Sequence, residues 1–334
     1  MTPDTINWLP SPKALEEWLD LTEKRGIEDL IGKSLLAPLN EFLNRPSKHF
    51  RSQLVRSGFD LVNNRSLANK YVDEAMQVLE AIHAASLVVD DIQDNSDLRR
   101  GLPALHKTYG LAVALNSANW LYFWPFETIG RWDVSDHTKL ELTRVCHRAL
   151  IRAHSGQALD VGTPISELPQ ERVKSVCLAS LELKTGALTA LALELGAVLA
   201  EGSPEQVSLL SRIGCDFGTA LQMFDDLGNI KEKIPADPKR FEDLKGRRPS
   251  WVWASAAEIL SSEEYKQFKD VVSKLPEEKE LKSYFQTAKW VDEAKQNAKD
   301  FLDAALARLD HIRWNGAAVD KVILLGETLK RSYE

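Results

Sequence analysis

The stretch Ser86-Leu87-Val88-Val89-Asp90-Asp91-Ile92-Gln93-Asp94-Asn95-Ser96-Asp97-Leu98-Arg99-Arg100 ends an apolar run of helical periodicity with several carboxylates and two guanidinium groups. Residues three, four and seven positions apart share one face of a helix, so Asp90 and Asp94 lie on the same face as His83. Two carboxylates one turn apart repel each other, and a divalent cation relieves that repulsion. Oxygen ligands suit magnesium, which also binds phosphate, and arginine forks onto phosphate oxygens. The stretch predicts a metal–phosphate site, with a solvated, charged helix end as the alternative.

A second acidic element follows the same design further along the chain. In the run Gly218-Thr219-Ala220-Leu221-Gln222-Met223-Phe224-Asp225-Asp226-Leu227-Gly228-Asn229, the residues Gln222, Asp225 and Asn229 share one helical face. A segment broken by proline and glycine then carries the basic residues Lys231, Lys233, Lys239, Lys245, Arg247 and Arg248. Such a segment beside acids is typical of a lid over a metal–phosphate complex. For Lys231 and Lys233 taken singly, a solvated surface loop is the better interpretation.

Two shorter segments also indicate phosphate binding. Lys48 and Arg51 lie close together at a predicted helix start, where backbone N–H groups favour anions as well. Lys184-Thr185-Gly186 interrupts an apolar helix, where a lysine is costly unless it is paired or faces a polar cavity. Gly186 suggests a kink at this point.

The composition indicates a globular protein in a reducing compartment. The 334 residues are 44% apolar and 27% charged, and the net charge of −7 disfavours nucleic-acid binding without excluding a small anionic substrate. Cys146, Cys177 and Cys215 are widely spaced in apolar helical patterns, which predicts buried free thiols. We find no signal-peptide pattern, and the apolar segment from Ala187 to Ala200 falls short of a membrane span. We therefore expect a soluble, cytoplasmic protein.

Helical periodicity recurs along the chain. After an irregular lead-in at residues 1–10, helices are predicted at about 11–26, 29–44, 50–62, 72 into the first acidic stretch, 111–129, 136–157, 169–200, 204–233, 249–272, 278–310 and 317–332. No alternating apolar–polar run is bounded by turn signals, so no strands are expected. Without a linker or repeat, residues 1–334 are predicted to form a single all-α domain, most irregular at 235–250.

Together these motifs resemble those of the trans-prenyl diphosphate synthases, most of all geranylgeranyl diphosphate synthases of the eukaryotic type. The resemblance runs from about Pro46 to Ser250. Asp90-Asp91-Ile92-Gln93-Asp94 matches the first aspartate-rich motif of the family, and Asp225-Asp226-Leu227-Gly228-Asn229 matches the second in its Asn-ended form. Further matches are Lys48, Arg51, Asn95-Ser96, Leu98-Arg99-Arg100-Gly101, His106, Tyr109-Gly110, Asn116-Ser117-Ala118-Asn119, Gln157, Lys184-Thr185 and Gln222.

The resemblance implies an all-α isoprenoid-synthase fold, usually homodimeric, in which the two acidic motifs face a central cavity. It implies a magnesium-dependent prenyltransferase whose small-molecule substrates are isopentenyl and allylic diphosphates. Asp90, Asp94 and Asp225 would hold three magnesium ions on the allylic diphosphate, with Asp226 and Asn229 as further metal candidates. The other implied roles belong to Asp91, Thr185 and Gln222 in catalysis, Arg99, Lys184 and Lys239 on the allylic diphosphate, and Lys48, Arg51, His83 and Arg100 on isopentenyl diphosphate.

Some residues depart from the family pattern. Ser47 stands where glycine is usual, and Leu221 replaces an aromatic residue. The helix expected to floor the product cavity is unusually bulky, with Trp120, Tyr122, Phe123 and Trp124. We hypothesise that Trp120, Phe123 and Trp124 limit the product to roughly fifteen to twenty carbons, with ordinary core or dimer-interface packing as the alternative.

Two other functions stay open. A class I terpene cyclase on the same scaffold would ionise a prenyl diphosphate without condensation, and Ser47, Leu221 and the extra aromatic residues are compatible with it. A cyclase has little use for a second diphosphate site, so condensation is favoured by the presence of Lys48, Arg51, His83 and Arg100. A non-catalytic partner subunit should have eroded acidic motifs, and these are intact. Head-to-tail condensation is therefore the predicted reaction.

Overall fold

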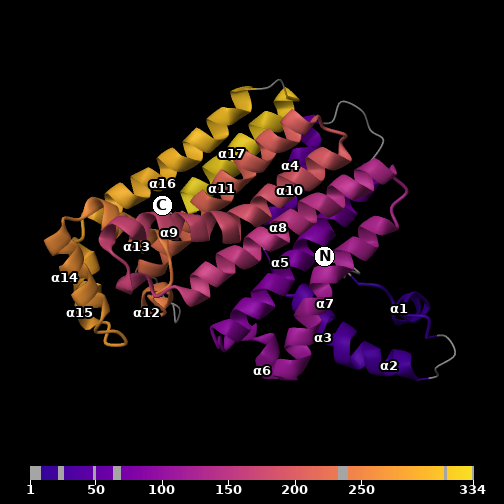
Figure 1. Ribbon diagram of the computed structural model, residues 1–334, viewed down its shortest axis with the longest axis horizontal. Helices are drawn as coiled ribbons and strands as arrows, with labels where there is room; N and C mark the ends of the chain where they lie inside the picture. The colour runs from indigo at the N-terminus through magenta and orange to yellow at the C-terminus, as the bar shows by residue number, and fades with distance from the viewer. Residues whose placement is uncertain are drawn as a thin grey trace. The chain divides into compact units, whose positions relative to one another are not determined.

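The computed structural model describes residues 9–21, 26–47, 50–62, 69–231, 240–311 and 314–332, which are mostly helical (Figure 1). The elements in chain order are α1 (Pro12–Trp18), α2 (Ile27–Ile31), η1 (Gly32–Leu36), α3 (Ala37–Leu43), α4 (Phe50–Val62), η2 (Asn69–Tyr71), α5 (Val72–Gln93), β1 (Leu98–Arg99), β2 (Leu102–Pro103), α6 (Leu105–Tyr109), α7 (Leu111–Gly130), α8 (Asp136–Gly162), η3 (Ile165–Glu167), α9 (Gln170–Leu181), η4 (Glu182–Gly186), α10 (Ala187–Leu199), α11 (Pro204–Ile230), α12 (Glu242–Lys245), α13 (Trp251–Ile259), α14 (Ser262–Val272), α15 (Lys279–Thr287), α16 (Trp290–Ala307), η5 (Arg308–His311) and α17 (Gly316–Ser332). The predicted all-α class is confirmed.

The chain divides into two compact units. Unit 1 comprises Met1–Gln53 and Lys70–Lys139, and unit 2 comprises Leu54–Asn69 and Leu140–Glu334. Each unit is described by itself below. The single domain predicted for residues 1–334 stays a prediction.

In unit 1, the long helix α5 packs against α7. Ala85 and Val88 of α5 are buried in one apolar cluster with Ala118 and Leu121 of α7. The alanines let the two backbones approach closely, and each larger side chain that is fully buried contributes about 1.5–3 kcal/mol. The packed face orients α5, so the carboxylates at its C-terminal end project from a rigid support.

In unit 2, α10 is buried along its whole length and packs against α11. Residues 54–62 of α4 also cross α10 at Gly196, where an added Cβ would overlap the Val55 carbonyl oxygen. Helix α11 begins at a capping box formed by Ser203 and Gln206, with Pro204 in its first turn. It carries Gln222, Asp225 and Asn229 toward its C-terminal end.

Several predicted boundaries were wrong. Leu98–Arg99 and Leu102–Pro103 form a two-stranded antiparallel hairpin, although no strands were expected. The helix predicted at 249–272 is broken into α13 and α14, because a capping box of Ser261 and Glu264 starts a new helix. The helix predicted at 278–310 is likewise divided into α15 and α16.

The continuous helical stretch Gln170–Leu199 is long and apolar enough to cross a membrane by length and composition alone. Within the part of the chain that the structure describes, it is the one stretch of this kind, and 67% of its most apolar window is buried inside the protein. Core helices of soluble proteins pass the same test, so this stretch is weak evidence for a membrane span.

Candidate active site

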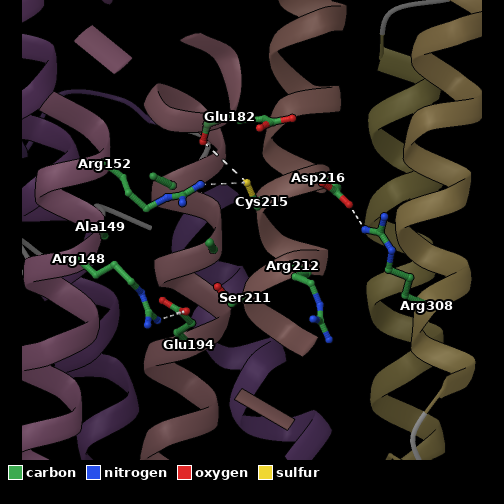
Figure 2. Close-up of a pocket in the computed structure, with 12 residues that line it drawn as sticks. Arg148, Ala149, Arg152, Glu182, Glu194, Ser211, Arg212, Cys215, Asp216 and Arg308 are labelled. Carbon is green, nitrogen blue, oxygen red and sulfur yellow. Dashed lines mark hydrogen bonds and ion pairs between the residues drawn. The ribbon is translucent and has the colours of Figure 1, made fainter. Parts of the chain in front are cut away.

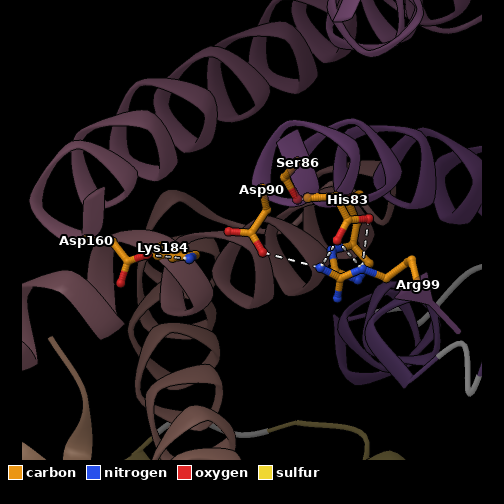
Figure 3. A network of polar contacts seen from close by, with 7 residues as sticks. His83, Ser86, Asp90, Arg99, Asp160 and Lys184 are labelled. Carbon is orange, nitrogen blue, oxygen red and sulfur yellow. Dashed lines mark hydrogen bonds and ion pairs between the residues drawn. The ribbon is translucent and has the colours of Figure 1, made fainter. Parts of the chain in front are cut away.

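The first carboxylate cluster, Asp90, Asp91 and Asp94, lies at the C-terminal end of α5 in unit 1. The Asp91 side chain is 0% exposed, and its two oxygens accept hydrogen bonds from Arg99 Nε at 2.9 and 3.1 Å. Arg99 Nη2 also donates to Asp91 Oδ1 at 2.5 Å and lies 3.4 Å from Asp90 Oδ2 (Figure 3). The Asp90 side chain is 21% exposed and Asp94 is exposed. Asp90 and Asp94 are therefore the members of this cluster that solvent can reach.

The hairpin explains how Arg99 returns to Asp91. Arg100 and Gly101 have φ values of 56° and 78°, so the chain reverses within two residues and Arg99 lies beside the helix that precedes it. Arg45, which is buried, donates to the Arg99 carbonyl at 3.2 Å and to the Pro103 carbonyl at 2.8 Å. Sequence reasoning missed Arg45. Its one local signal is an arginine that immediately precedes Pro46 at the end of an apolar helix.

Three predicted ligands of isopentenyl diphosphate lie in the same unit. Arg51 Nη1 is 3.4 Å from His83 Nε2, and burial together with Arg51 and Arg100 lowers the pKa of His83. The His83 ring is therefore neutral near pH 7, and Nε2 can accept a hydrogen bond from the Arg51 guanidinium. The Arg100 guanidinium packs over the Phe42 ring at 5.9 Å. Lys48, the fourth predicted ligand, lies outside the described residues.

In unit 2, the π-helical turn η4 carries Lys184, Thr185 and Gly186. Lys184 Nζ donates to Asp160 Oδ2 at 2.9 Å, which supplies the partner that a lysine in an apolar helix requires (Figure 3). Thr185 Oγ1 donates to Gln222 Oε1 at 2.8 Å. The extra residue of a π turn rotates the following helix face, and such turns are common at functional sites. The kink predicted at Gly186 is therefore a π-helical turn, and Asp160 is a site residue that the sequence analysis missed.

The second carboxylate cluster, Asp225, Asp226 and Asp243, divides into exposed and buried members. Asp226 is buried, and its oxygens accept hydrogen bonds from Gln222 Nε2 at 2.9 Å and from the Trp251 backbone N–H at 2.6 Å. Burial raises the pKa of Asp226, and the nearby Asp243 carboxylate raises it further. Asp225 is exposed. Asp243 was missed by the sequence analysis because it lies in α12, beyond the motif.

Of the two other predicted site residues in this region, Asn229 lies within the described residues and Lys239 does not. The half-buried Asn229 lies one turn after Asp225 on α11, and its backbone carbonyl accepts the Phe241 N–H at 3.1 Å. Its predicted metal role stays a prediction, as does that of Asp226. Lys233 and Lys239 lie outside the described residues.

The aromatic residues of α7 do not form one surface. Trp120 and Trp124 stack with ring centroids 6.5 Å apart, and Trp124 is buried in the core of unit 1. Burial and the Asp90 charge raise the pKa of Tyr122, which places that phenol near the first carboxylate cluster. Phe123 is 71% exposed. The structure therefore separates Phe123 from the two tryptophans with which it was predicted to floor the product cavity.

The donors in each cluster suit a hard cation. Magnesium is held in proteins by one or two carboxylates, several waters and the phosphates of a substrate. Asp90 and Asp94 provide such a pair in unit 1, and Asp225 provides an open carboxylate in unit 2. Among the described residues, no group of three or more His, Cys, Asp or Glu side chains could hold a metal ion by itself. The donor chemistry thus fits magnesium bound together with substrate phosphate.

A sequence profile of the polyprenyl synthetase family matches residues 32–288. The chain belongs to this family. A geranylgeranyl pyrophosphate synthase from Aspergillus fumigatus is 30% identical over 267 residues, which cover 79% of this chain and 70% of that protein. A protein named terpene synthase, from Matsumurasca onukii, is 31% identical over 226 residues, or 67% of this chain and 69% of that protein.

A solved structure shows the same fold. The geranylgeranyl pyrophosphate synthase from Corynebacterium glutamicum, complexed with isoprenyl diphosphate and magnesium, has a TM-score of 0.72 at 21% identity. The alignment covers 96% of this chain and 97% of that one, and it shows the fold. The predicted isoprenoid-synthase fold and the predicted class of enzyme, a prenyltransferase that makes prenyl diphosphates, are confirmed.

Proposed function

We propose that this polyprenyl synthetase joins isopentenyl diphosphate head-to-tail to an allylic diphosphate, in a magnesium-dependent reaction that gives a product of roughly fifteen to twenty carbons. The observation that carries the proposal is the group of Arg51, His83 and Arg100 in unit 1, which accompanies the first carboxylate cluster. Condensation needs a second diphosphate site of this kind, whereas cyclisation does not. One relative is named terpene synthase, but the family profile and the relatives named geranylgeranyl pyrophosphate synthase do not favour cyclisation.

The open carboxylates define the metal ligands in this proposal. Asp90, Asp94 and Asp225 would hold magnesium ions, which supply positive charge to the departing diphosphate. Asp91 and Asp226 are buried and hydrogen-bonded, so we assign them to positioning. Asp91 holds Arg99 beside Asp90, and Asp226 fixes Gln222, which in turn accepts a hydrogen bond from Thr185.

The basic side chains bind the two diphosphates. Lys184 carries positive charge to the allylic diphosphate, and the ion pair with Asp160 limits the orientations of its ammonium group. Preorganised charge of this kind acts on the transition state without a cost of reorganisation. On isopentenyl diphosphate, the neutral His83 ring leaves the positive charge to Arg51 and Arg100.

We also propose that the protein is a cytoplasmic homodimer. Leu111, Leu115 and Phe123 are exposed large apolar side chains along α7, and a second protomer would remove such a row from water. Cys146, Cys177 and Cys215 are free thiols, which supports a reducing compartment. Sedimentation of the purified protein tests the dimer, because a monomer at micromolar concentration would contradict it.

Product analysis tests the reaction. The pure protein is incubated with magnesium, isopentenyl diphosphate and each allylic diphosphate in turn. Condensation requires both substrates, cyclisation proceeds with the allylic substrate alone, and an inert subunit yields neither product. Either of the last two outcomes would overturn the proposal.

Variants test the assignment of residues. Replacing Asp90 or Asp225 by asparagine should lower kcat by about 10²-fold or more, because the charge of the leaving group is then less well neutralised. Asp97→Asn is the matched control, since its side chain is 85% exposed and pairs with Lys107 at 3.1 Å on the surface. If Asp90→Asn and Asp97→Asn are equally active, Asp90 is not a ligand of the metal.

A further inference from the structure

Unit 2 contains a cavity of about 460 Å³ that none of the acidic motifs lines (Figure 2). It is bordered by α8, η4, α10, α11 and η5, and its volume lies within the range of small-molecule sites. Ala149, Ala187 and Ala190 form part of the wall, and their short side chains leave the space open. The remaining wall is polar and includes four arginines, Arg148, Arg152, Arg212 and Arg308.

Two of these arginines are neutralised by carboxylates. Glu194 is 2% exposed in the middle of α10, and Arg148 Nη2 donates to its Oε1 at 2.5 Å. Burial raises the pKa of Glu194, while Ser211 and Arg148 lower it through hydrogen bonds and charge. Arg308 forms an ion pair with Asp216. These pairs fix two side walls of the cavity.

No ion pair joins either of the other two arginines to a carboxylate among the described residues, although the charge of Arg152 acts on Glu194 and lowers its pKa. Arg152 lies one turn after Arg148 on α8, and its Nη2 is 3.9 Å from Cys215 Sγ. Burial raises the pKa of the Cys215 thiol, so the sulfur is neutral near pH 7 and does not balance the guanidinium. Arg212 is exposed at the rim, and in the described ranges it has no hydrogen bond or ion pair.

The last acid of the cavity does not restore the balance. The Glu182 backbone carbonyl accepts a hydrogen bond from the Cys215 thiol, and no ion pair joins the Glu182 side chain to an arginine in the described part of unit 2. Four guanidinium groups thus face three carboxylates. The cavity has an excess of positive charge and unused N–H donors from two different helices.

We propose that this cavity binds a diphosphate-type anion at a site separate from the active site. Guanidinium forks match phosphate oxygens, and donors from both α8 and α11 suit a ligand with two phosphate groups. The choice of diphosphate among multivalent oxyanions rests on the proposed function, whose substrates and released product carry this group. The anion has two sources, free inorganic diphosphate and the head group of a prenyl diphosphate.

Calorimetric titration with inorganic diphosphate tests the site. It is carried out without magnesium, in EDTA and at ~0.15 M salt, so that surface charges are screened. Arg152→Gln and Arg212→Gln should each weaken the affinity by about 10-fold or more, since each removes charged hydrogen bonds. Arg144→Gln is the matched control, because Arg144 lies on α8 outside the cavity and pairs with Glu141. The circular dichroism spectrum and Tm of each variant verify the fold.

The outcomes separate the site from the proposed function. Absence of saturable binding up to millimolar diphosphate, or equal affinity of all three variants, overturns the proposal. Loss of binding in Arg152→Gln and Arg212→Gln alone supports it, whether or not the condensation assay yields product. Titration with farnesyl diphosphate then identifies the source. If farnesyl diphosphate binds more tightly than inorganic diphosphate, and Arg212→Gln weakens that binding, the natural ligand is a prenyl diphosphate. If the two ligands bind with equal affinity, the natural ligand is the free anion.

Discussion

Removing the Arg99 side chain should lower the free energy of unfolding, because the buried Asp91 carboxylate then loses its charged hydrogen-bond donor. Asp91 is fully buried, and three N–H···O contacts of 2.5 to 3.1 Å join it to Arg99. In Arg99→Met the carboxylate keeps its burial and loses these donors. Breaking one side of a buried ion pair costs about 3–5 kcal/mol, so the free energy of unfolding should fall by that amount. Arg99→Lys should lose less, about 1.5–3 kcal/mol, because a charge remains without the fork.

Urea unfolding followed by circular dichroism measures this effect. Adding Asp91→Asn to Arg99→Met should recover at least 1.5 kcal/mol or so, because the stranded charge is gone, and a double-mutant cycle gives the coupling. Arg144→Met is the control, since its surface pair with Glu141 should contribute at most about 1 kcal/mol. A loss below about 1 kcal/mol in Arg99→Met, with no coupling to Asp91, would refute the positioning role. If the double variant regains stability but not activity, Arg99 also binds substrate.

Three other perturbations follow from the packing and electrostatics. Burial raises the pKa of Glu194 in the folded protein above its unfolded pKa of about 4.3. At a pH between these two pKa values, the unfolded chain has lost the Glu194 proton, whereas the folded protein keeps it. Stability should therefore fall as pH rises through this window, and Glu194→Gln should flatten a plot of Tm against pH; an unchanged slope would contradict this origin. Gly196→Ala should lower stability by about 1–3 kcal/mol, because its Cβ would overlap the Val55 carbonyl, whereas Gly130→Ala, which meets open space, should not. Trp120→Ala should lengthen the product if this ring limits the chain, and mass spectrometry of the products would show no change if it only packs the core.

Local patterns predicted the elements that carry the acidic motifs. Helices α5 and α11 are long and strongly periodic, so Asp90, Asp94 and Asp225 could be placed on helix faces from spacing alone. The hairpin that returns Arg99 could not, because each of its strands has two residues and no alternating pattern can develop over that length. The break at Ser261 depends on a capping box, which competes with an apolar periodicity that continues across it. At Ala288 the helix ends at a residue with a non-helical ψ of 84°, and no side-chain cap marks the break in the sequence.

The partners of the basic side chains were beyond local patterns. Lys184 required a counterion, but its acceptor Asp160 lies 24 residues earlier, on a different helix. Arg45 holds carbonyl groups 54 and 58 residues away, and nothing in the sequence around it indicates that distance. Long-range pairing of this kind is determined by tertiary packing. Chemistry could therefore predict that a partner was needed, and only the fold could identify it.

The two aspartate pairs have a common division of labour. In each pair the first residue, Asp90 or Asp225, remains open to solvent, and the second, Asp91 or Asp226, is buried and hydrogen-bonded. Adjacent helical residues point about 100° apart, so one side chain of a pair can face solvent while its neighbour faces the packed interior. A buried carboxylate is costly unless donors satisfy it. The donors to Asp91 come from Arg99 in the hairpin that follows α5, and those to Asp226 come from Gln222 on the same helix and from the Trp251 backbone N–H. The consecutive aspartates therefore do more than double the negative charge. In each pair, the solvent-accessible aspartate is available as a metal ligand, and the buried aspartate holds the same helix in contact with the residues that act beside that ligand.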